Sequence, residues 1–229
     1  MFFFKFVVVP EPFAFYPLNA RYKAAEKENR QREGLLGDVA VTNGPYNEPG
    51  GAYMFYSTHN SYILFPRERH PSDWFSITLM CWVQPGGQDG PLFSYEDLNW
   101  GISIRIAHGK FLFAFRNILI FFPCSITREV LPMGKWVHVA ASYHHNTGNN
   151  SLYVNGHLRT LQSISSDYRD PVNAYEFRMG STRYGSDHFK GKIAEMKVYD
   201  VALYEAQIQT LIRQGSCFFP LTALFLPIR

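Results

Sequence analysis

Acidic residues are the first candidates for chemistry in this 229-residue chain. Hydrolysis of a glycosidic bond requires two carboxylates that flank the bond, and residues of one strand share a face only when they alternate. No run of the E-x-D-x-x-E type occurs in the sequence. Glu96 and Asp97 are adjacent and would point in opposite directions on a strand, whereas Glu195 and Asp200 lie five positions apart. The carboxylates therefore give little support to a hydrolytic enzyme.

Nucleophiles and soft metal ligands show no catalytic pattern either. The sequence has no G-x-S-x-G motif, the turn that presents a nucleophilic serine in many hydrolases. His144 and His145 are neighbours without a nearby cysteine or carboxylate, and the surrounding HHNTGNN predicts a solvated hairpin tip. The cysteines Cys81, Cys124 and Cys217 form no C-x-x-C pair, so neither a zinc site nor a redox motif is indicated.

Composition and charge favour a globular β domain over a nucleic-acid-binding protein. The formal net charge is only +3, and the lysines and arginines are scattered rather than clustered, so we expect no nucleic-acid partner. Aromatic residues make up 17% of the chain and apolar residues 46%, a composition that suits side chains packed on pleated sheets. The length suits one all-β domain, since such domains run to roughly 200–250 residues.

Both ends of the chain are apolar, but neither predicts a membrane segment. The opening MFFFKFVVVP is interrupted by Pro10, and no signal-peptide cleavage site follows it. The apolar stretch at 218–228 is far shorter than the roughly 20 residues that a membrane-spanning helix needs. We therefore expect no transmembrane segment, and we assign residues 1–12 and 215–229 to apolar segments outside a domain at 13–214.

Short alternating segments separated by turn residues predict strands. In residues 75–83, Ile77, Leu79 and Cys81 would face one side of a sheet while Met80 would face the other, which is the period of two that strands show. Further strand-like segments lie at residues 52–56, 61–65, 100–107, 111–115, 136–143, 151–154, 157–164 and 189–199.

The connections between these segments complete the predicted fold class. Asn155-Gly156 predicts a tight hairpin turn. Residues 20–33 are polar all round and predict a solvated loop, and residues 203–213 have helical spacing that ends before Gly215. About ten strands, one C-terminal helix and no βαβ alternation predict an all-β, two-sheet antiparallel β-sandwich or jelly roll.

Four segments, in this order, resemble laminin-G-like domains, the pentraxin-related group with a concanavalin A-like jelly roll. They are YPLN at 16–19 with GGAYMFYSTHNSYILFP at 50–66, DWFSITLMCWVQP at 73–85, GKWVHVAASYHHNTGNNSLYVNG at 134–156, and the closing segment at 178–211. In this interpretation Trp136 fills space between the sheets, and Gly191 permits a close backbone approach within its strand.

The resemblance also raises two questions of detail. Pentraxin-like relatives often carry a disulfide from the strand of Cys81 to the strand at 136–143, but Ala140 stands at the expected partner position, so we predict that Cys81 is buried and not bonded to that strand.

Many relatives bind calcium at the rim of the sandwich. Oxygen ligands suit this ion, so Asp89 and Asp187 in predicted loops are candidate ligands, with ordinary loop acids as the alternative.

The resemblance implies a binding or adhesion module that recognises a glycan or an extracellular-matrix protein. In YEDLNW, Tyr95, Asp97, Asn99 and Trp100 combine aromatic and polar groups as a sugar site would, although Trp100 could equally belong to the core. The alternative is a structural matrix component without a discrete ligand site. A glycoside hydrolase, which the same fold also houses, is the third possibility, and the carboxylates argue against it.

A glycosylation signal supports an extracellular location. Asn149-Asn150-Ser151 matches the N-glycosylation acceptor sequence and lies in the predicted hairpin that follows residues 136–143. Because a glycan at Asn149 would be accessible there, we predict that the protein is secreted and glycosylated at this residue.

Overall fold

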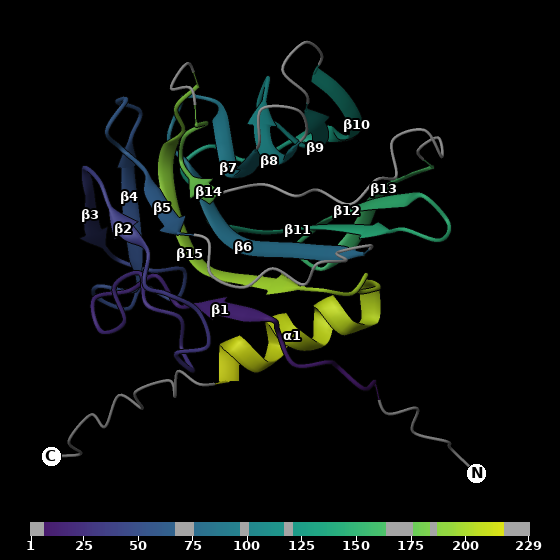
Figure 1. The fold of residues 1–229 in the computed structure, drawn as a ribbon, viewed down its shortest axis with the longest axis horizontal. Helices are drawn as coiled ribbons and strands as arrows, with labels where there is room; N and C mark the ends of the chain where they lie inside the picture. The colour runs from purple at the N-terminus through teal and green to yellow at the C-terminus, as the bar shows by residue number, and fades with distance from the viewer. Residues whose placement is uncertain are drawn as a thin grey trace, which may run out of the picture.

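The computed structural model of the protein describes residues 7–66, 76–96, 101–116, 121–163, 176–183 and 187–217. Two antiparallel β-sheets form the body of the molecule, and a helix lies beside one of them (Figure 1). This architecture confirms the predicted two-sheet β-sandwich with a C-terminal helix.

The first layer is an eight-stranded sheet. Its strands follow the order β13 (His157–Ser163), β12 (Asn149–Val154), β11 (Val137–His144), β6 (Ile77–Pro85), β15 (Lys190–Tyr199), β4 (Ala52–Tyr56) and β3 (Val39–Thr42), and β1 (Ala14–Tyr16) also pairs with β15.

The second layer is a seven-stranded sheet. Its strands follow the order β10 (Phe121–Val130), β9 (Lys110–Arg116), β8 (Gly101–Ala107), β7 (Gly90–Glu96), β14 (Glu176–Met179), β5 (Ile63–Pro66) and β2 (Leu35–Leu36). Strands far apart in the sequence, such as β7 and β14, are neighbours in this sheet, so the order of its strands is set by long-range pairing.

Alternation along β6 decides which side chains form the core between the sheets. Ile77, Leu79, Cys81 and Val83 are almost fully buried in the main hydrophobic cluster, which also contains the inward side chains of β7, β8 and β9. Met80 lies on the other side of the sheet, in a second cluster beneath the helix. The alternation predicted for this segment is confirmed.

The helix α1 (Glu205–Cys217) covers part of the outer face of the eight-stranded sheet (Figure 1). Ile208 and Leu211 are buried against outward residues of that sheet. The amide of Tyr204, just before the helix, donates to Oε1 of Gln207 over 3.2 Å, which is one half of a capping box and explains why the helix begins here. The helix continues to Cys217, beyond the predicted stop before Gly215.

Thr78 fastens the segment before α1 to β6. Its hydroxyl oxygen accepts a hydrogen bond from the amide of Leu203 at 2.9 Å, and the hydroxyl donates to the carbonyl of Val201 at 2.8 Å. The bond to Leu203 is buried, so it satisfies a backbone amide that water does not reach, and the bond to Val201 is part-buried. Thr78 therefore sets the position at which α1 starts.

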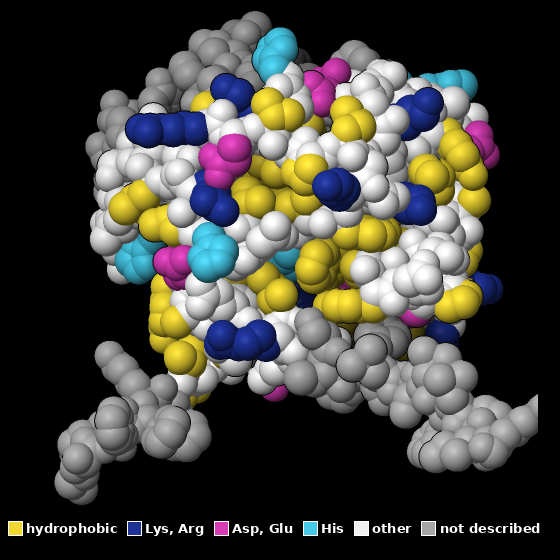
Figure 2. Space-filling model, turned by 180° about the vertical axis from the view of Figure 1, so that it is seen from behind, with side chains coloured by type: hydrophobic (Ala, Val, Ile, Leu, Met, Phe, Trp, Pro, Cys, Tyr) yellow, Lys and Arg dark blue, Asp and Glu magenta, His cyan; other side chains and the backbone are white. Residues whose placement is uncertain are grey.

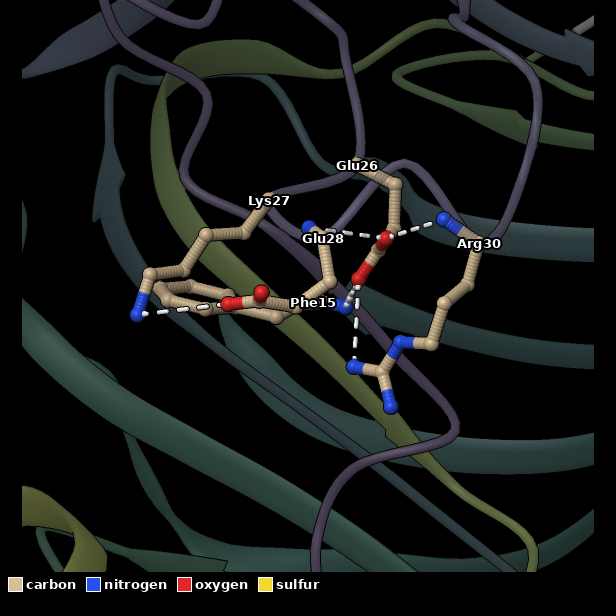
Figure 3. A network of polar contacts seen from close by, with 5 residues as sticks. All are labelled: Phe15, Glu26, Lys27, Glu28 and Arg30. Carbon is tan, nitrogen blue, oxygen red and sulfur yellow. Dashed lines mark hydrogen bonds and ion pairs between the residues drawn. The ribbon is translucent and has the colours of Figure 1, made fainter.

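The polar segment 20–33 contains no helix or strand, as predicted, but it is not wholly solvated. Figure 3 shows the polar contacts of Glu26 with Phe15, Glu28 and Arg30, and Glu26 is only 1% exposed. The carboxylate accepts hydrogen bonds from the amides of Phe15, Glu28 and Arg30 at 2.8–3.1 Å and from the guanidinium of Arg30 at 3.3 Å. A fully partnered buried carboxylate thus ties this loop to β1.

Cys81 is a free, buried thiol, as predicted, but the register shows that Ala140 was wrongly taken as the position opposite it. Cys81 lies opposite Val139 in β11, whereas Ala140 lies opposite Met80 and faces the second cluster. Burial raises the pKa of the Cys81 thiol to about 12, so it stays protonated and unreactive at neutral pH.

Six strands were not predicted from the sequence: β1, β2, β3, β7, β10 and β14. Four of them have only two to four residues, and β7 and β10 contain Pro91 and Pro123, which obscure a strand pattern. Trp136 is only partly buried and belongs to neither hydrophobic cluster, so its predicted place between the sheets was wrong. Gly191 has a φ of +150°, and a Cβ there would collide with Gln84 and Phe189, which confirms the close approach.

The two apolar ends differ in what the structure describes. Residues 1–6 and 218–229 lie outside the described residues. Residues 7–12 run along α1, where Val9 packs against the second cluster and the carbonyl of Val8 accepts a hydrogen bond from Gln207 at 2.9 Å. No helix in the described part of the chain has the length and apolar character that crossing a membrane requires.

Candidate functional site

The sugar site predicted at residues 95–100 falls largely outside the described residues, which do not include Asp97, Asn99 and Trp100. Tyr95 belongs to β7 and is 4% exposed. Its ring faces the core, with its centroid 6.4 Å from that of Phe177. In this position Tyr95 offers little surface to a ligand.

The two candidate calcium ligands already have protein partners. The carboxylate of Asp89 accepts a hydrogen bond from the amide of Gly109, in the β8–β9 turn, at 3.1 Å. Asp187 pairs with the guanidinium of Arg105 at 2.9 Å. Within the described ranges, no group of three or more His, Cys, Asp or Glu side chains is arranged to hold a metal ion. Calcium binding stays a prediction.

The glycosylation candidate Asn149 is the first residue of β12 and is partly exposed. Its side-chain oxygen accepts a hydrogen bond from the hydroxyl of Ser163, on the neighbouring strand, at 2.8 Å. The next residue, Asn150, is fully buried and accepts a hydrogen bond from Ser125. Glycosylation at Asn149 stays a prediction.

A groove of about 540 Å³ lies between the β12–β13 hairpin and the start of α1, and we call it the hairpin–helix groove. This volume is within the range of roughly 300–1,000 Å³ that small-molecule sites occupy. The groove is lined by Ser151, Tyr153, Leu158, Leu161, Tyr204, Glu205, Ala206 and Gln209. Apolar and polar groups therefore meet in one open depression.

The apolar part of the groove is exposed to solvent. Tyr204 is 54% exposed, Leu161 57% and Leu158 40%. These are large hydrophobic side chains on a surface, and such exposure gathered around a depression marks a binding site more often than an isolated exposed residue does. The groove can therefore hold the apolar face of a ligand.

The polar part of the groove centres on Glu205. Its Oε1 is 3.4 Å from Nδ1 of His157 and accepts hydrogen bonds from the amide of Leu158 at 3.3 Å and the side chain of Gln209 at 3.4 Å. All three contacts are made to Oε1. Glu205 thus holds the hairpin against the helix and keeps Oε2 available to a ligand hydroxyl.

The hairpin turn fixes the width of the groove. Asn155 and Gly156 have φ values of +51° and +78°, the left-handed pair that a type I′ turn requires. A Cβ at Gly156 would lie 3.0 Å from Cγ of Gln209 and 3.1 Å from Cδ1 of Ile212. The predicted Asn-Gly turn is confirmed, and the absence of a side chain at Gly156 lets the turn rest on α1.

Tyr153 forms the floor of the groove. Its ring is 4% exposed, and its hydroxyl donates to the carbonyl of Leu203 at 3.4 Å. Burial raises the pKa of the Tyr153 phenol, with a further increase from the nearby Glu205 and an opposing hydrogen bond from Ser151. The phenol therefore remains protonated and acts as a structural donor rather than as an acid or base.

Buried titratable groups elsewhere on the eight-stranded sheet do not form a reactive cluster. Burial, assisted by the charge of Lys197, lowers the pKa of His138 to about 3, so its ring is neutral at physiological pH. The ring lies edge-on to Trp82, with centroids 5.3 Å apart. Burial also raises the pKa of Glu195 and lowers that of Lys197, because removal from water disfavours the charged form of each side chain.

Sequence reasoning missed the groove because its two walls lie about fifty residues apart in the chain. The available signal was the pair Tyr204-Glu205, an aromatic and an acid at the first turn of an amphipathic helix. On its own this pair is also typical of a helix start, since acids are favoured there. Only the packing of the hairpin against the helix identifies the pair as part of a site.

The distribution of charge gives no sign of a nucleic-acid surface on the face in Figure 2. There, lysine and arginine side chains are interspersed with acidic and hydrophobic ones and form no continuous basic patch. Phosphate backbones are bound by clustered basic residues, and the described residues of this face form no such cluster; the absence of a nucleic-acid partner stays a prediction.

Comparisons with solved structures show the same fold in binding domains. Domain 4 of AbnA, a GH43 extracellular arabinanase from Geobacillus stearothermophilus, solved in complex with arabinotriose, matches with a TM-score of 0.70 and 22% identity, covering 88% of this chain and 98% of that domain. The botulinum neurotoxin serotype G binding domain matches with a TM-score of 0.68 and 16% identity, and the serotype D binding domain with 0.70 and 15%.

These toxin matches cover 90% and 89% of this chain, but the chain spans only about half of each toxin domain, 51% in both cases. No curated protein sequence matches this chain. The family of laminin-G type described as the concanavalin A-like lectin/glucanases superfamily matches residues 57–209, which is well over half of the sequence. The chain therefore belongs to the concanavalin A-like lectin/glucanase superfamily.

Proposed function

We propose that this protein is a secreted, non-catalytic module that binds a saccharide in the hairpin–helix groove. The observation that carries the proposal is the half-exposed ring of Tyr204 directly beside the polar groups of Glu205 and Gln209. A sugar ring presents an apolar C–H face and a rim of hydroxyl groups. An aromatic face with hydrogen-bonding groups at its edge complements both.

Two kinds of neighbour support a binding role. The arabinanase domain was solved in complex with arabinotriose, and the botulinum domains are receptor-binding domains. Since the sequence identities are below a quarter, these likenesses extend to the fold and leave the ligand of this chain open. A saccharide is favoured because the volume of the groove lies within the range of small-ligand sites.

The composition of the groove favours binding over hydrolysis. Glycoside hydrolysis requires two carboxylates that flank the scissile bond, and Glu205 is the one carboxylate among the residues that line the groove. Its Oε1 is also engaged by three partners. Glu205 is therefore suited to hold a ligand hydroxyl.

A glycan array with the purified chain, followed by titration of the best ligand by calorimetry, tests the proposal; arabinotriose is the first probe. Replacement of the stacking ring in Tyr204→Ala is expected to weaken binding at least tenfold, or about 1.4 kcal/mol. The matched control is Tyr56→Ala, because Tyr56 is 50% exposed and lies on β4. Equal loss in both variants, or no glycan bound by the wild type, would contradict the proposal.

Two further arms separate the alternatives. Titration in EDTA tests calcium: loss of binding would support a site at Asp89 and Asp187, and unchanged binding would remove it. Incubation with the bound glycan, with detection of new reducing ends, tests for a hydrolase. A chain that binds no glycan but retains an immobilised matrix protein would favour the structural matrix role over the proposed function.

A further inference from the structure

A register shift in the β12–β13 hairpin turns two leucines toward the hairpin–helix groove. Leu161 lies opposite Ser151 and Leu158 lies opposite Tyr153, and the pairing is irregular between Leu152 and Tyr153. In a regular strand, residues three positions apart point to opposite faces of the sheet. The shift, of the kind that a β-bulge produces, places both leucines at the groove, where they are 40% and 57% exposed. The hairpin wall of the groove is therefore apolar and accessible.

The opposite wall, formed by Tyr204 and the start of α1, is aromatic and polar. The ring of Tyr204 is 54% exposed. The contacts of the Glu205 carboxylate within the described ranges are all made to Oε1, which leaves Oε2 open as an acceptor. Gln209 donates one N–H to Oε1 of Glu205, and a side-chain amide has a second N–H to offer. This wall thus holds a ring surface, an acceptor and a donor.

A plain hexose would leave the leucine wall uncovered. With one face of the sugar ring on Tyr204, the hydroxyl groups at the ring edge would meet Leu158 and Leu161. Those side chains cannot replace the hydrogen bonds that the hydroxyls make to water. An acetamido group differs, because its methyl is apolar, its N–H is a donor and its oxygen is an acceptor. A sugar that carries this group matches both walls.

The charge of the groove disfavours acidic sugars. Its described lining includes one carboxylate, that of Glu205, and no lysine or arginine. His157 contacts Glu205 at Oε1, at 3.4 Å, and so lies away from the open Oε2. A uronic acid, sialic acid or sulfated sugar would bring a second negative charge beside Oε2, and like charges across an interface weaken binding. The groove therefore suits a neutral ligand.

We propose that the hairpin–helix groove takes an N-acetylated amino sugar, an assignment of ligand class that rests on the proposed function of the same groove. The sugar ring packs on Tyr204. The acetamido N–H donates to Oε2 of Glu205, and the second N–H of Gln209 donates to the acetamido oxygen. The acetyl methyl contacts Leu158 and Leu161.

The chain has a source of such a sugar beside the groove. N-glycans are attached to asparagine through N-acetylglucosamine, and Asn149 is the predicted acceptor. Asn149 and Ser151 are alternate residues of β12, so they share its outer face and lie about 7 Å apart along the strand. A glycan on another molecule is the second source of the same chemistry.

Matched disaccharides test the ligand class. The unglycosylated chain is titrated by calorimetry with N,N′-diacetylchitobiose and with cellobiose, which has the same linkage but hydroxyls in place of the acetamido groups. The first is expected to bind at least tenfold more tightly. Leu161→Ala is expected to lower this ratio to about threefold and to leave the affinity for cellobiose unchanged. The matched control is Leu35→Ala, because Leu35 is 58% exposed on β2 of the other sheet, and it should keep the full ratio.

Equal affinity for the two disaccharides, or a ratio that Leu161→Ala does not change, would overturn the assignment and leave the proposed saccharide function standing. The same holds if neither disaccharide binds while another glycan binds and loses affinity in Tyr204→Ala. If no glycan binds at all, the proposed function fails together with the assignment.

Tyrosine nitration separates the two sources of the sugar. In the chain glycosylated at Asn149, protection of Tyr204 that disappears after enzymatic removal of the glycan assigns the chain's own glycan to the groove. Tyr56, 50% exposed on β4, is the matched control and should react equally in both forms. Equal reactivity of Tyr204 in both forms, with N,N′-diacetylchitobiose still bound by the glycosylated chain, assigns the groove to a glycan on another molecule.

Discussion

Glu26 and the serine pair Ser94 and Ser103 are all buried and polar, but they differ in how their polar atoms are satisfied. Glu26 carries a carboxylate into the protein and surrounds it with four hydrogen bonds from Phe15, Glu28 and Arg30. Ser94 and Ser103 are equally buried and have no partner. A buried polar group with all its partners is explained by the fold, whereas one without a protein partner is bound by an ordered water or lowers stability. The comparison therefore separates a buried group that the protein satisfies from two that it does not.

The largest expected effect is at Glu26. Glu26→Ala removes a buried acceptor that serves three backbone amides and a guanidinium, and we expect unfolding to become easier by about 3 kcal/mol. The matched control is Glu28→Ala, because the side chain of Glu28 is 59% exposed and pairs with Lys27 at 3.8 Å. That variant should change stability by about 0.5 kcal/mol or less. Chemical denaturation measures both, and equal effects would contradict the structural role of Glu26.

His138 is buried and its Nδ1 has no hydrogen-bond partner, so we expect acid to lower the stability of the protein through this residue. Its pKa is about 3 in the folded protein, against about 6.5 when unfolded, so the unfolded chain takes up the proton first. Stability is therefore full above pH 6.5 and falls as the pH drops toward 3, by about 2–3 kcal/mol at pH 4.5. His138→Leu should flatten this part of the stability profile, with Lys197, the charge that faces the ring, left in place. An unchanged slope would assign the acid sensitivity to other groups.

Thr78 belongs with Glu26 as a satisfied group. Thr78→Val preserves shape but leaves the amide of Leu203 and the carbonyl of Val201 without partners, and we expect a loss of about 2 kcal/mol. Because Leu203 precedes Tyr204, the same variant should also weaken glycan binding in the groove. Denaturation and calorimetry measure the two effects. Full stability in the variant would show that water replaces the hydroxyl.

The parts of the fold that could be predicted from the sequence are those that depend on residues close together in the chain. Alternation in β6, the Asn155-Gly156 turn and the helical spacing after Leu203 each depend on nearby residues, and the structure contains all three. β7 was missed because Pro91 interrupts its strand pattern and because it pairs with β14, which is distant in the chain. Missing β7 also explains why Tyr95 was proposed as part of a ligand site.

The candidate site depends on long-range packing even more strongly. The hairpin–helix groove exists because Gly156 meets Gln209, and Ser94 and Ser103 are neighbours because the register of β7 and β8 aligns them. Neither alignment leaves a periodic trace in the sequence. A binding role was expected from the family resemblance, but the location of the groove depends on the packing of the hairpin against the helix.

The smallest expected effect is the sharpest test of the comparison, because two buried serines of the same sheet differ in one respect. Ser103 is 1% exposed and has no partner, whereas Ser125 is 2% exposed and donates to Asn150 at 3.1 Å. Without ligand, Ser103→Ala should leave stability unchanged or raise it by about 1 kcal/mol, and Ser125→Ala should lower it by about 1 kcal/mol.

Burial and substitution are the same in the two serine variants, so a difference in sign can come only from the hydrogen bond. Denaturation curves measured in parallel give that sign directly. If Ser103→Ala destabilises the chain as much as Ser125→Ala does, the hydroxyl of Ser103 already has a partner such as an ordered water. Ser103 would then be satisfied in the same sense as Glu26, and the contrast between the two kinds of buried polar group would disappear.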